Sequence, residues 1–437
     1  MTEKEEFDAI VVGAGPSGCS TAIRLVQQNP SLNVALIDRG KPVGSKNTSG
    51  GILWGQSLSE IIPGWWKAAP IERRIVQKRT GFLTRKDAFV LELSFPEWAE
   101  DPPNAVSILF AKFVNWLANE AEKLGVNVFE GITVEDLSKD SAGKFNGIIQ
   151  AGEEFQTDAV VIAEGANSRL TLSSGLRKEM KKKYYALGVK DVLHLPEEVI
   201  NERFNLDSNT GVASEYVVSN PAFSEGLRSG GFLYTNQDTL SVGVVPQIDT
   251  MNDPDYPPYR ILEAFEKHPY IHKLVEGSKL VEYSARWIPE GGIHMLPKLY
   301  DDRVLVVGDA AGFTFSNGIV LQGINYAISS GIMAADTIVH AHERNDFSRK
   351  SMSLYEKKLK QSYVLKDLKK FRNIHKILRN TRIFEQYPEL ITGLFKDMLT
   401  ETGEPKDKIL KLFRMQRKRS KIGWFQLLRD GMSFRHF

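Results

Sequence analysis

Short runs of aliphatic and β-branched residues recur along the chain, and several of them end in a glycine or an acidic residue. Runs of this length with little polar alternation are typical of strands buried in a parallel sheet. They predict strands at residues 7–12, 34–37, 126–129, 131–135, 158–163 and 303–307. Apolar residues at helical spacing predict helices at residues 17–25, 108–124 and 324–341. Strands and helices arranged in this order favour an α/β fold.

The pattern changes between residues 184 and 283, where short strand-like pieces alternate with turns. The clearest pieces are residues 186–189, 230–234 and 240–245, and they predict an antiparallel sheet that forms a second domain. Because the strand at 158–163 returns to the first sheet after a long excursion, the two domains are expected to be interleaved. We expect the first domain to comprise residues 1–183 and 284–341, including insertions, and the second domain to comprise residues 184–283.

Beyond residue 342 the pattern predicts a helical segment, with helices at 351–380, 389–399 and 406–430. Residues 342–437 contain 24 Lys and Arg against 11 Asp and Glu, a net charge of +13, whereas the rest of the chain contains 32 against 43, or −11. This asymmetry indicates an anionic partner, either a lipid surface or an acidic protein. Nucleic acid is not expected, because the segment contains no recognisable reader motif.

Apolar residues are interspersed among the basic residues of this tail, at Ile409, Leu410, Leu412, Phe413, Trp424, Phe425, Leu427 and Leu428. Such a mixture fits a docking or interfacial segment, and it fits ordinary packing against the body equally well. The adjacent Trp65 and Trp66 allow the same two interpretations, contact with a membrane interface or burial in the core.

Length and composition limit the number of domains, the location and the cysteine chemistry that we expect. A chain of 437 residues favours two connected domains. No apolar run reaches the roughly 18 to 20 residues that a membrane-spanning helix requires, and the acidic N-terminus is unlike a signal peptide, so a cytoplasmic location is the simplest expectation. Cys19 is the only cysteine, which excludes disulfides within the chain and any iron–sulfur cluster held by four of its thiolates. It is expected to be a small packed residue of the first helix.

Gly13, Gly15 and Gly18 form a G-x-G-x-x-G pattern between the first predicted strand and the first predicted helix. The first glycine permits a tight turn, the second lets the backbone approach a pyrophosphate, and the third lets helix and strand pack closely. Asp38 ends the second predicted strand, 20 residues after Gly18, where an acid binds a ribose hydroxyl. The N-terminus of the helix adds unpaired N–H groups, so this region predicts a dinucleotide site.

A second motif follows the predicted strand at 303–307. Gly308 and Asp309 lead into small residues and then into a helix that starts after Gly323. Asp309 could accept a hydrogen bond from a ribityl hydroxyl, and the helix start could stabilise negative charge on a reduced flavin. The alternative is a structural turn with an N-capping aspartate. Two such motifs about 290 residues apart indicate one extended cofactor, FAD, rather than a loosely held nicotinamide.

Two double glycines are further candidates for contact with a ligand. Gly50 and Gly51 lie in a loop of small polar residues that could bring backbone close to a flavin ring, or that could be an ordinary surface turn. Gly230 and Gly231 precede a strand-like stretch, and glycine inside a strand often marks the approach of a ligand to the backbone.

Residues for other kinds of catalysis do not stand out. No acid/base pair or nucleophile with a nearby base is evident. The histidines His268, His272, His294 and His375 have no metal-ligand spacing and are expected to be structural or exposed. A flavoenzyme that only passes electrons needs none of these groups, because its cofactor performs the chemistry.

Taken together, several motifs resemble the electron transfer flavoprotein:quinone oxidoreductase superfamily. They are GAGPSG at 13–18, KNTSGG at 46–51, GGFLY at 230–234, the stretch at 266–286, EGG at 290–292 and GDAAGF at 308–313. The resemblance covers about the first 340 residues. It implies a Rossmann-type, glutathione-reductase-like FAD domain, a second domain with a quinone site at the backbone of Gly230 and Gly231, and monotopic attachment to a membrane.

The resemblance also implies which residues contact the cofactor. Asp38 would bind the adenosine ribose, Asp309 the ribityl chain, and residues 323–325 the pyrimidine end of the flavin. The full expected set is Gly13, Gly15, Pro16, Ser17, Gly18, Asp38, Arg39, Gly40, Lys46, Gly50, Gly51, Gly165, Gly308, Asp309, Gly323, Ile324 and Asn325.

One departure indicates the subfamily. Single-chain members end in a ferredoxin-like domain whose cysteines hold an iron–sulfur cluster, whereas this chain ends in basic helices without cysteine. It therefore resembles the FixC-type subunit of Fix/Etf electron-bifurcating complexes, whose cluster lies on a separate FixX-type ferredoxin-like protein.

The implied function is to take electrons from an electron transfer flavoprotein heterodimer, directly or through that ferredoxin-like protein, and to reduce menaquinone or ubiquinone at the inner face of the cell membrane. Bifurcation from NADH would occur in the heterodimer. The alternatives are a geranylgeranyl-reductase-type enzyme acting on isoprenoid lipids, a flavin monooxygenase, and a scaffold without activity.

Overall fold

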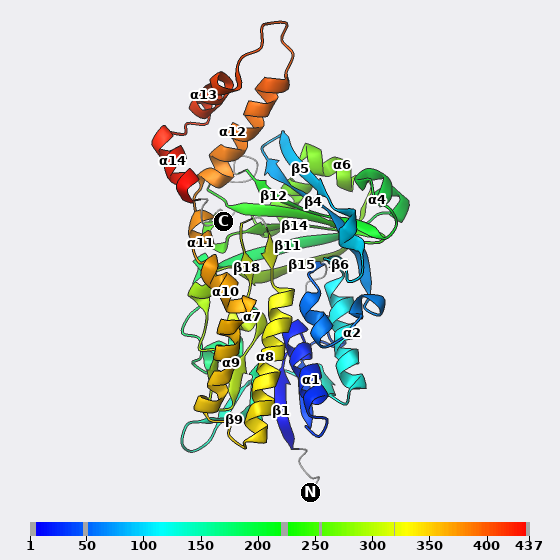
Figure 1. Ribbon diagram of the computed structural model, residues 1–437, viewed down its shortest axis with the longest axis vertical. Helices are drawn as coiled ribbons and strands as arrows, with labels where there is room; N and C mark the ends of the chain where they lie inside the picture. Colours follow the sequence, from blue (N-terminus) through cyan, green and yellow to red (C-terminus); the bar gives the residue numbers. More distant parts are fainter. Residues whose placement is uncertain (1–5, 47–50, 220–225, 253–255, 319, 434–437) are drawn as a thin grey trace.

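The computed structural model describes residues 6–46, 51–219, 226–252, 256–318 and 320–433. Two sheets form the body of the molecule, one above the other in the view of Figure 1, and the C-terminal helices extend beyond the upper sheet. The arrangement confirms the expected α/β class, with a Rossmann-like first domain and a helical C-terminal segment.

The first sheet has parallel strands at its centre. Along the sheet the strands are β16 (Tyr300–Asp301), β17 (Val304–Val306), β10 (Glu153–Ile162), β1 (Phe7–Val12), β2 (Val34–Asp38) and β7 (Asn127–Glu130). All neighbours from β17 to β7 are parallel, while β16 is antiparallel to β17. Two further strands, β8 (Asp136–Lys139) and β9 (Phe145–Gln150), extend the start of β10 as an antiparallel meander.

The helices that pack with this sheet in one hydrophobic core include α1 (Pro16–Gln28), α2 (Phe110–Lys123) and α8 (Ile324–Glu343). Small residues allow α1 and α8 to approach closely, because a Cβ at Gly331 of α8 would overlap the carbonyl oxygen of Ser17. Cys19 of α1 is fully buried, and its Sγ lies 3.1 Å from the carbonyl oxygen of Ala14. Burial raises the pKa of this thiol, so the predicted packing role is confirmed.

The second sheet contains strands from outside the predicted range of residues 184–283. Along the sheet the strands are β15 (Lys279–Pro289), β11 (Tyr185–His194), β14 (Thr239–Pro246), β13 (Ser229–Thr235), β12 (Thr210–Val218), β4 (Ile71–Leu83), β6 (Val106–Ile108) and β3 (Gly51–Leu53), with β5 (Ala88–Ser94) paired to β4. Strands β3 to β6 come from before residue 184, and β15 extends beyond residue 283. The sheet is antiparallel except for the parallel pair β12 and β4, which the sequence did not predict.

Helices cover one face of the second sheet. They are α4 (Glu197–Phe204), α5 (Pro258–Glu266) and α6 (Pro269–Val275), whose apolar residues form a second core with β11 to β14. Side chains alternate between the faces of a strand, so the residues next to those in this core point toward the first domain. This opposite face is the one that contributes to the candidate site.

Three predicted elements differ from those observed. Residues 132–135 are not a strand, and β8 starts only at Asp136. The expected helix at 351–380 is three helices, α9 (Arg349–Gln361), α10 (Tyr363–Lys370) and α11 (Ile374–Ile377), because the Ser362 side chain caps a new helix by accepting from the Val364 N–H. The expected helix at 406–430 is α13 (Ile409–Arg419) and α14 (Trp424–Ser433), separated where Lys421 adopts φ of 56°.

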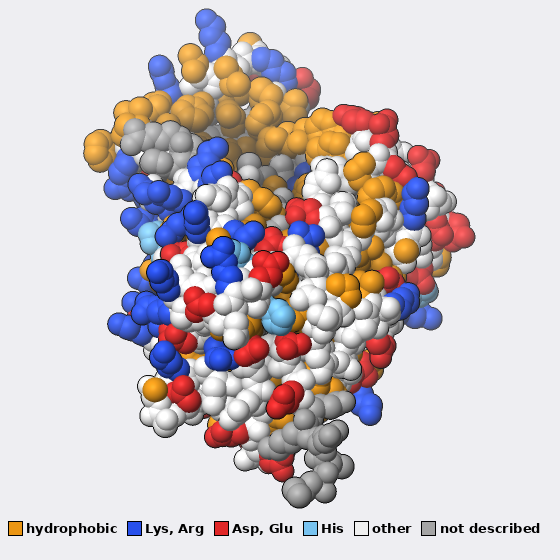
Figure 2. Space-filling view, turned by 60° about the horizontal axis from the view of Figure 1, so that its bottom comes forward, with side chains coloured by type: hydrophobic (Ala, Val, Ile, Leu, Met, Phe, Trp, Pro, Cys, Tyr) orange, Lys and Arg blue, Asp and Glu red, His pale blue; other side chains and the backbone are white. Residues whose placement is uncertain are grey.

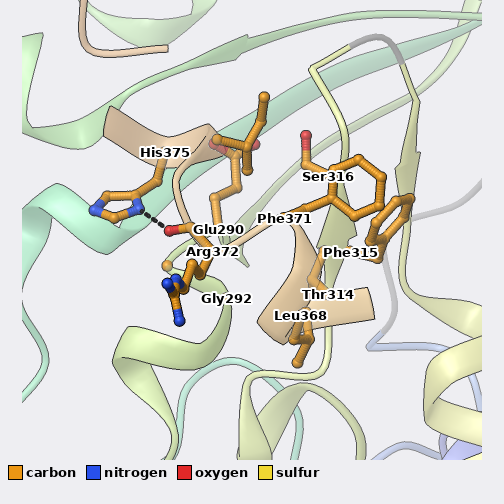
Figure 3. A pocket seen from close by; sticks show the side chains of 11 residues that line it. Glu290, Gly292, Thr314, Phe315, Ser316, Leu368, Phe371, Arg372 and His375 are labelled. Carbon is orange, nitrogen blue, oxygen red and sulfur yellow. Dashed lines mark hydrogen bonds between the residues drawn. The ribbon is translucent and has the colours of Figure 1, made fainter. Parts of the chain in front are cut away.

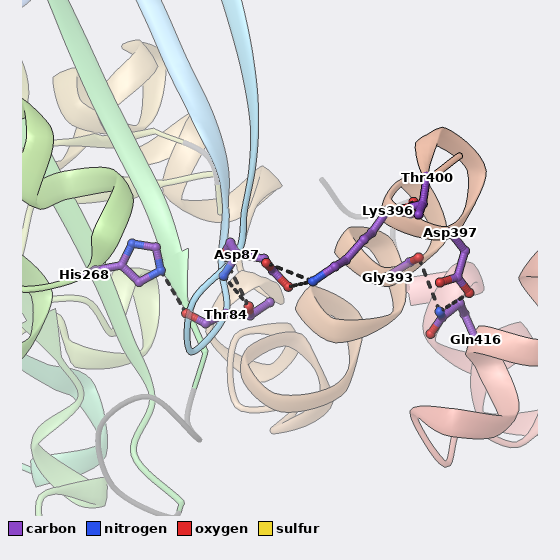
Figure 4. A network of polar contacts seen from close by, with 8 residues as sticks. All are labelled: Thr84, Asp87, His268, Gly393, Lys396, Asp397, Thr400 and Gln416. Carbon is purple, nitrogen blue, oxygen red and sulfur yellow. Dashed lines mark hydrogen bonds and ion pairs between the residues drawn. The ribbon is translucent and has the colours of Figure 1, made fainter. Parts of the chain in front are cut away.

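The C-terminal helices are attached to the hairpin formed by β4 and β5 (Figure 4). In α12 (Arg382–Leu399), Lys396 Nζ lies 3.0 Å from an Asp87 carboxylate oxygen, and the Phe395 ring stacks on Phe89 with centroids 4.8 Å apart. Gln416 of α13 donates to Asp397 of α12 over 2.6 Å. These contacts hold α12 and α13 at the far end of the second sheet.

The two adjacent tryptophans are packed inside the protein. Trp65 is 1% exposed and Trp66 is partly buried against the same core, with ring centroids 6.0 Å apart. The core interpretation therefore holds for Trp65, which has no surface left to contact a membrane.

Candidate functional site

The first glycine motif forms a turn between β1 and α1 in which each glycine has a different role. Gly13 has φ of 106°, which favours glycine, and a Cβ there would overlap the carbonyl oxygen of Ala163. A Cβ at Gly18 would overlap the carbonyl oxygen of Gly13, so these two glycines allow close packing. No atom of the described part of the chain lies within 4 Å of a Cβ placed on Gly15. The open position at the helix N-terminus is suited to an approaching pyrophosphate.

Asp38 fixes the turn that follows β2. Its two carboxylate oxygens accept from the Ala14 N–H over 2.8 Å and from the Gly40 N–H over 2.6 Å. A carboxylate has about four acceptor positions, so two remain for a ribose hydroxyl. Asp38 and Gly40 therefore lie beside the first glycine motif, as expected from the sequence.

The second motif lies directly against the first. Gly308 begins the short helix α7 (Gly308–Ala311) with φ of 60°, and a Cβ there would lie 2.6 Å from Ser17 Oγ of α1. Its N–H donates to Ser330 Oγ of α8 over 3.0 Å. The fold thus brings together two motifs that are far apart in the chain, and Ser330 is a contact that the sequence did not reveal.

A second group of predicted residues gathers at the N-terminus of α8. Asp309 Oδ1 and Thr314 Oγ1 each lie 3.8 Å from the position of a Cβ on Gly323, and Ile324 Cδ1 lies 4.0 Å from the corresponding position on Gly51. Burial raises the pKa of the Asp309 carboxyl, and the positive charge of Arg286 opposes this rise.

Three hydrogen bonds hold Asn325, which lies in the first turn of α8. Its carbonyl oxygen accepts from the Tyr363 hydroxyl over 3.0 Å and from Ser57 Oγ over 3.3 Å, and its side-chain amide donates to Gln322 over 3.1 Å. Its Oδ1 atom is buried and has no hydrogen-bond partner among the described residues. An unpaired buried acceptor at this point fits a donor group of a bound ligand, such as a flavin N–H.

Arg286 connects the second sheet to this group. It lies on β15, and its Nη2 atom is 2.5 Å from the position of a Cβ on Gly165, which has φ of 77° and follows β10. The sequence did not identify Arg286 as a site residue, although it ends the stretch at 266–286 that carried part of the resemblance. Only the fold places this cation near Asp309.

Three predicted site residues are not drawn into these groups by the described part of the structure. Arg39 and Lys46 are exposed, and Gly50 lies outside the described residues. Pro16 and Ser17 form the first turn of α1, as expected. The roles of Arg39, Lys46 and Gly50 remain predictions.

The two glycines of β13 face opposite sides of the sheet. A Cβ at Gly231 would overlap the Phe265 ring of α5, so this residue points to the helix-covered face. Gly230 points to the other face together with Phe232 and Tyr234, whose rings stack with centroids 4.9 Å apart. Among the described residues, the nearest atom to a Cβ on Gly230 is the Tyr216 carbonyl oxygen at 3.6 Å, so none of them fills this position.

These features fit an FAD molecule bound in an extended form. The open turn at Gly15 fits its pyrophosphate, and the α8 N-terminus with Asp309 and the unpaired Asn325 oxygen fits its flavin end. A metal centre has no comparable support, because no cluster of three or more His, Cys, Asp or Glu side chains suitable for a metal ion occurs within the described ranges.

Family models match three parts of the chain. Residues 8–103 match FAD dependent oxidoreductases, residues 185–288 match the family "ETF-QO, ubiquinone-binding", and residues 374–435 match the "ETF-QO/FixC family C-terminal domain". The last match covers α12 to α14, the segment for which the sequence predicts basic helices.

Curated relatives align with nearly the whole chain. The probable electron transfer flavoprotein-quinone oxidoreductase YdiS of Escherichia coli is 38% identical over 431 residues, which is 98% of each protein. Protein FixC of Escherichia coli K12 is 37% identical over 98% of this chain and 97% of its own length, and Protein FixC of Azorhizobium caulinodans is 34% identical over 98% of both.

Solved structures share the fold at low identity. A geranylgeranyl bacteriochlorophyll reductase-like protein from Thermoplasma acidophilum has a TM-score of 0.71 and 19% identity, covering 98% of this chain and 99% of its own. The flavin-dependent brominase Bmp2 has a TM-score of 0.62 and 13% identity, covering 95% and 100%. These likenesses concern the fold, whereas the curated relatives are similar in sequence from end to end. The chain therefore belongs to the electron transfer flavoprotein-quinone oxidoreductase/FixC family and is an FAD-dependent oxidoreductase.

Proposed function

We propose that this chain takes electrons from an electron transfer flavoprotein heterodimer and reduces a membrane quinone, menaquinone or ubiquinone. The observation that carries the proposal is the open face of β13 at Gly230. It belongs to the same sheet as Arg286, which reaches Gly165 beside the flavin end of the FAD site. A quinone on this face would lie between the second sheet and the cofactor. The match of residues 185–288 to the ubiquinone-binding family supports this placement.

Bound FAD supplies the ability to accept and donate one or two electrons. The chain's own residues bind it and adjust its environment. Asp309 would accept a ribityl hydrogen bond, and the N-terminus of α8 at Gly323 would stabilise negative charge at the pyrimidine end. Arg286 adds a positive charge on the side of the second sheet, which also favours the reduced, more negative state.

We propose that electrons arrive from an electron transfer flavoprotein heterodimer within an NADH-oxidising bifurcating complex, either directly or through a FixX-type ferredoxin-like iron–sulfur protein. Cys19 is the only cysteine, and it is buried, so a cluster would be held by that separate protein.

We also propose peripheral attachment to the inner face of the cell membrane. None of the helices in the described part of the chain is long and apolar enough to cross a bilayer. Large apolar side chains are exposed where β5 and the C-terminal helices meet, at Leu91, Leu93, Phe395, Leu399, Ile409, Leu410, Met415, Trp424, Phe425, Leu428 and Met432. We call this set the C-terminal apolar surface.

Figure 2 shows hydrophobic side chains gathered at this end of the molecule with Lys and Arg side chains near them. The last turn of α13 contributes Arg417, Lys418 and Arg419. Apolar side chains that insert between lipids, with basic side chains that meet anionic headgroups, are typical of a segment lying in the membrane interface. The surface thus supports contact with lipid.

The function is tested by anaerobic reoxidation. The protein is purified with any associated chains, its flavin and iron contents are measured, and the chemically reduced form is mixed with a soluble quinone analogue. We expect fast reoxidation, with iron present only when a small partner co-purifies. Bound FAD that ignores quinone but saturates the double bonds of an isoprenoid would contradict the proposal and support a reductase of isoprenoid lipids.

The quinone site is tested by Gly230→Ala. The added methyl group projects into open space at the proposed site, and the backbone of Gly230 does not require a positive φ. We expect normal FAD content and a KM for the quinone analogue raised about tenfold, as overfilling a closely fitting site costs about 1–3 kcal/mol. An unchanged KM would place the quinone elsewhere.

The neighbouring glycine is a matched control. In Gly231→Ala the methyl group would overlap the Phe265 ring on the opposite face. We expect a loss of about 1–3 kcal/mol in the free energy of unfolding, measured by denaturant titration, and an unchanged KM in the folded protein.

A further inference from the structure

Two small adjoining pockets, which we together call the passage, lie near the flavin end of the proposed site, and Figure 3 shows the residues that line the first of them. One pocket is lined by residues from the end of β15, from β18 (Phe315–Ser316) and from α10 and α11, including Glu290, Thr314, Ser316 and His375. A second pocket shares Glu290, Ser316 and His375 with the first and is also lined by Lys183, Leu378 and Arg379. The two pockets therefore meet at Glu290.

The inner end of the passage lies at the start of α8. Thr314 lines the first pocket, and its Oγ1 is 3.8 Å from the position of a Cβ on Gly323. Asp309 Oδ1 lies at the same distance from that position. Gly323 is the residue expected at the pyrimidine end of the flavin, so the first pocket lies close to the proposed cofactor site.

Glu290 is partly buried and has no directly paired cation among the described residues. Its carboxylate accepts from the Gln247 side-chain amide, and its N–H donates to the Tyr184 carbonyl oxygen over 2.8 Å. The nearby Arg228 is 2.7 Å from Asp249 instead. Burial raises the pKa of the Glu290 carboxyl to about 7, although the Gln247 hydrogen bond and the charge of Arg228 oppose the rise. This carboxyl can therefore gain or lose a proton near neutral pH.

The outer end holds two histidines. The rings of His294 and His375 have centroids 4.6 Å apart, and a ring nitrogen of each lies within 3.2 Å of the Arg372 carbonyl oxygen. Burial and the charge of His294 lower the pKa of His375, so this ring is neutral and able to exchange a proton at pH 7.

Charged and titratable groups approach Glu290 from several elements. They are Lys183 and Tyr184 before β11, Arg228 at the start of β13, Asp249 after β14, His294 after β15, and Arg372, His375 and Arg379 around α11. Of these, Arg228 is the cation that lowers the pKa of Glu290, and its effect is reduced because Asp249 neutralises it.

We propose that Glu290 is the inner group of a proton route that connects solvent, through His375, with the flavin end of the site. The inference rests on the proposed function, in which a quinone takes up two electrons from the reduced flavoprotein partner by way of the cofactor, together with two protons, to become a quinol. Glu290 donates a proton toward the site, and its carboxylate is then reprotonated from solvent through the pocket.

The test replaces Glu290 with Gln, which keeps the shape and an oxygen acceptor for Gln247 but cannot ionise. The first measurement needs no activity. An infrared titration of the purified protein follows the carbonyl stretch of protonated carboxyls. Burial and the neighbouring Asp191 raise the pKa of Glu266 to about 7 as well. We therefore expect a band that disappears near pH 7 in the wild-type protein and that is weaker by one carboxyl in Glu290→Gln. The exposed Glu179 is the matched control, and Glu179→Gln should keep the band.

The second measurement follows reoxidation of reduced protein by the quinone analogue between pH 6 and 8. We expect the wild-type rate to fall with rising pH above about 7, and Glu290→Gln to be about 10- to 100-fold slower at pH 6 with no pH dependence in this range, because positioned proton transfer contributes about 10²–10⁴ in rate. Glu179→Gln should match the wild type.

The outcomes separate this inference from the proposed function. A wild-type protein that ignores quinone refutes the function, whereas the infrared titration still tests Glu290. Normal reoxidation and a normal pH profile in Glu290→Gln overturn the proton route and leave quinone reduction intact. A neutral-pH carboxyl band of unchanged intensity in the variant overturns it as well.

Discussion

Asp309→Ala is expected to release FAD. The carboxylate lies at the start of α8 beside Gly323, and a hydrogen bond to a charged acceptor contributes about 1.5–3 kcal/mol. Its loss should raise the Kd for FAD about 10- to 100-fold. The measurement is the ratio of flavin absorbance to protein after gel filtration at low protein concentration.

Two controls separate cofactor binding from folding. Asp309→Asn keeps an oxygen acceptor in the same place and should retain more FAD than the alanine variant. Because burial raises the pKa of Asp309, its negative charge is unfavourable in the folded protein without ligand. The cofactor-free alanine variant should therefore be at least as stable to denaturant above pH 5 as the cofactor-free wild type. Unchanged flavin content would contradict the role of Asp309.

The second large effect is expected at the C-terminal apolar surface. Leu410 is 67% exposed and Phe425 is 76% exposed, and burying such a side chain in an apolar phase is worth about 1.5–3 kcal/mol. Replacing both with Glu should lower partitioning onto vesicles of anionic lipid about 100-fold or more, because it removes apolar contact and adds repulsion. The measurement is co-sedimentation with vesicles at fixed ionic strength.

A matched control lies on the edge strand β15. Leu280 and Val281 are 60% and 64% exposed, and replacing them with Glu makes the same change in charge away from the C-terminal helices. We expect this variant to bind vesicles like the wild type. Equal losses in both variants would mean that net charge, rather than the C-terminal apolar surface, governs binding to lipid.

The dinucleotide-binding core could be predicted from local patterns. Strands β1, β2 and β17 and the last part of β10 are short apolar runs that are mostly buried on both faces, so their hydrophobicity identifies them without knowledge of their partners. Gly13 and Gly308 adopt positive φ. The need for glycine at such positions depends on the local backbone alone, so it also can be predicted from the sequence.

The prediction failed where distant segments decide the structure. β12 pairs in parallel with β4, which is far away in the chain, and no local pattern specifies such a partner. The tail was expected to form fewer, longer helices because its apolar spacing continues across Ser362. The capping side chain of Ser362 and the left-handed turn at Lys421 outweighed that pattern.

The sequence by itself determined the cofactor class, the family and the glycines whose backbone must adopt a positive φ or pack closely, such as Gly13 and Gly308. These properties depend on residue type and short spacing, since only glycine removes the Cβ that would block a turn or a contact. The tertiary structure alone decided that Arg286 meets Gly165 and that Glu290, Thr314 and His375 line one passage. Burial and charge at a point in space set the pKa of Glu290, and the groups that supply them come from segments far apart in the chain.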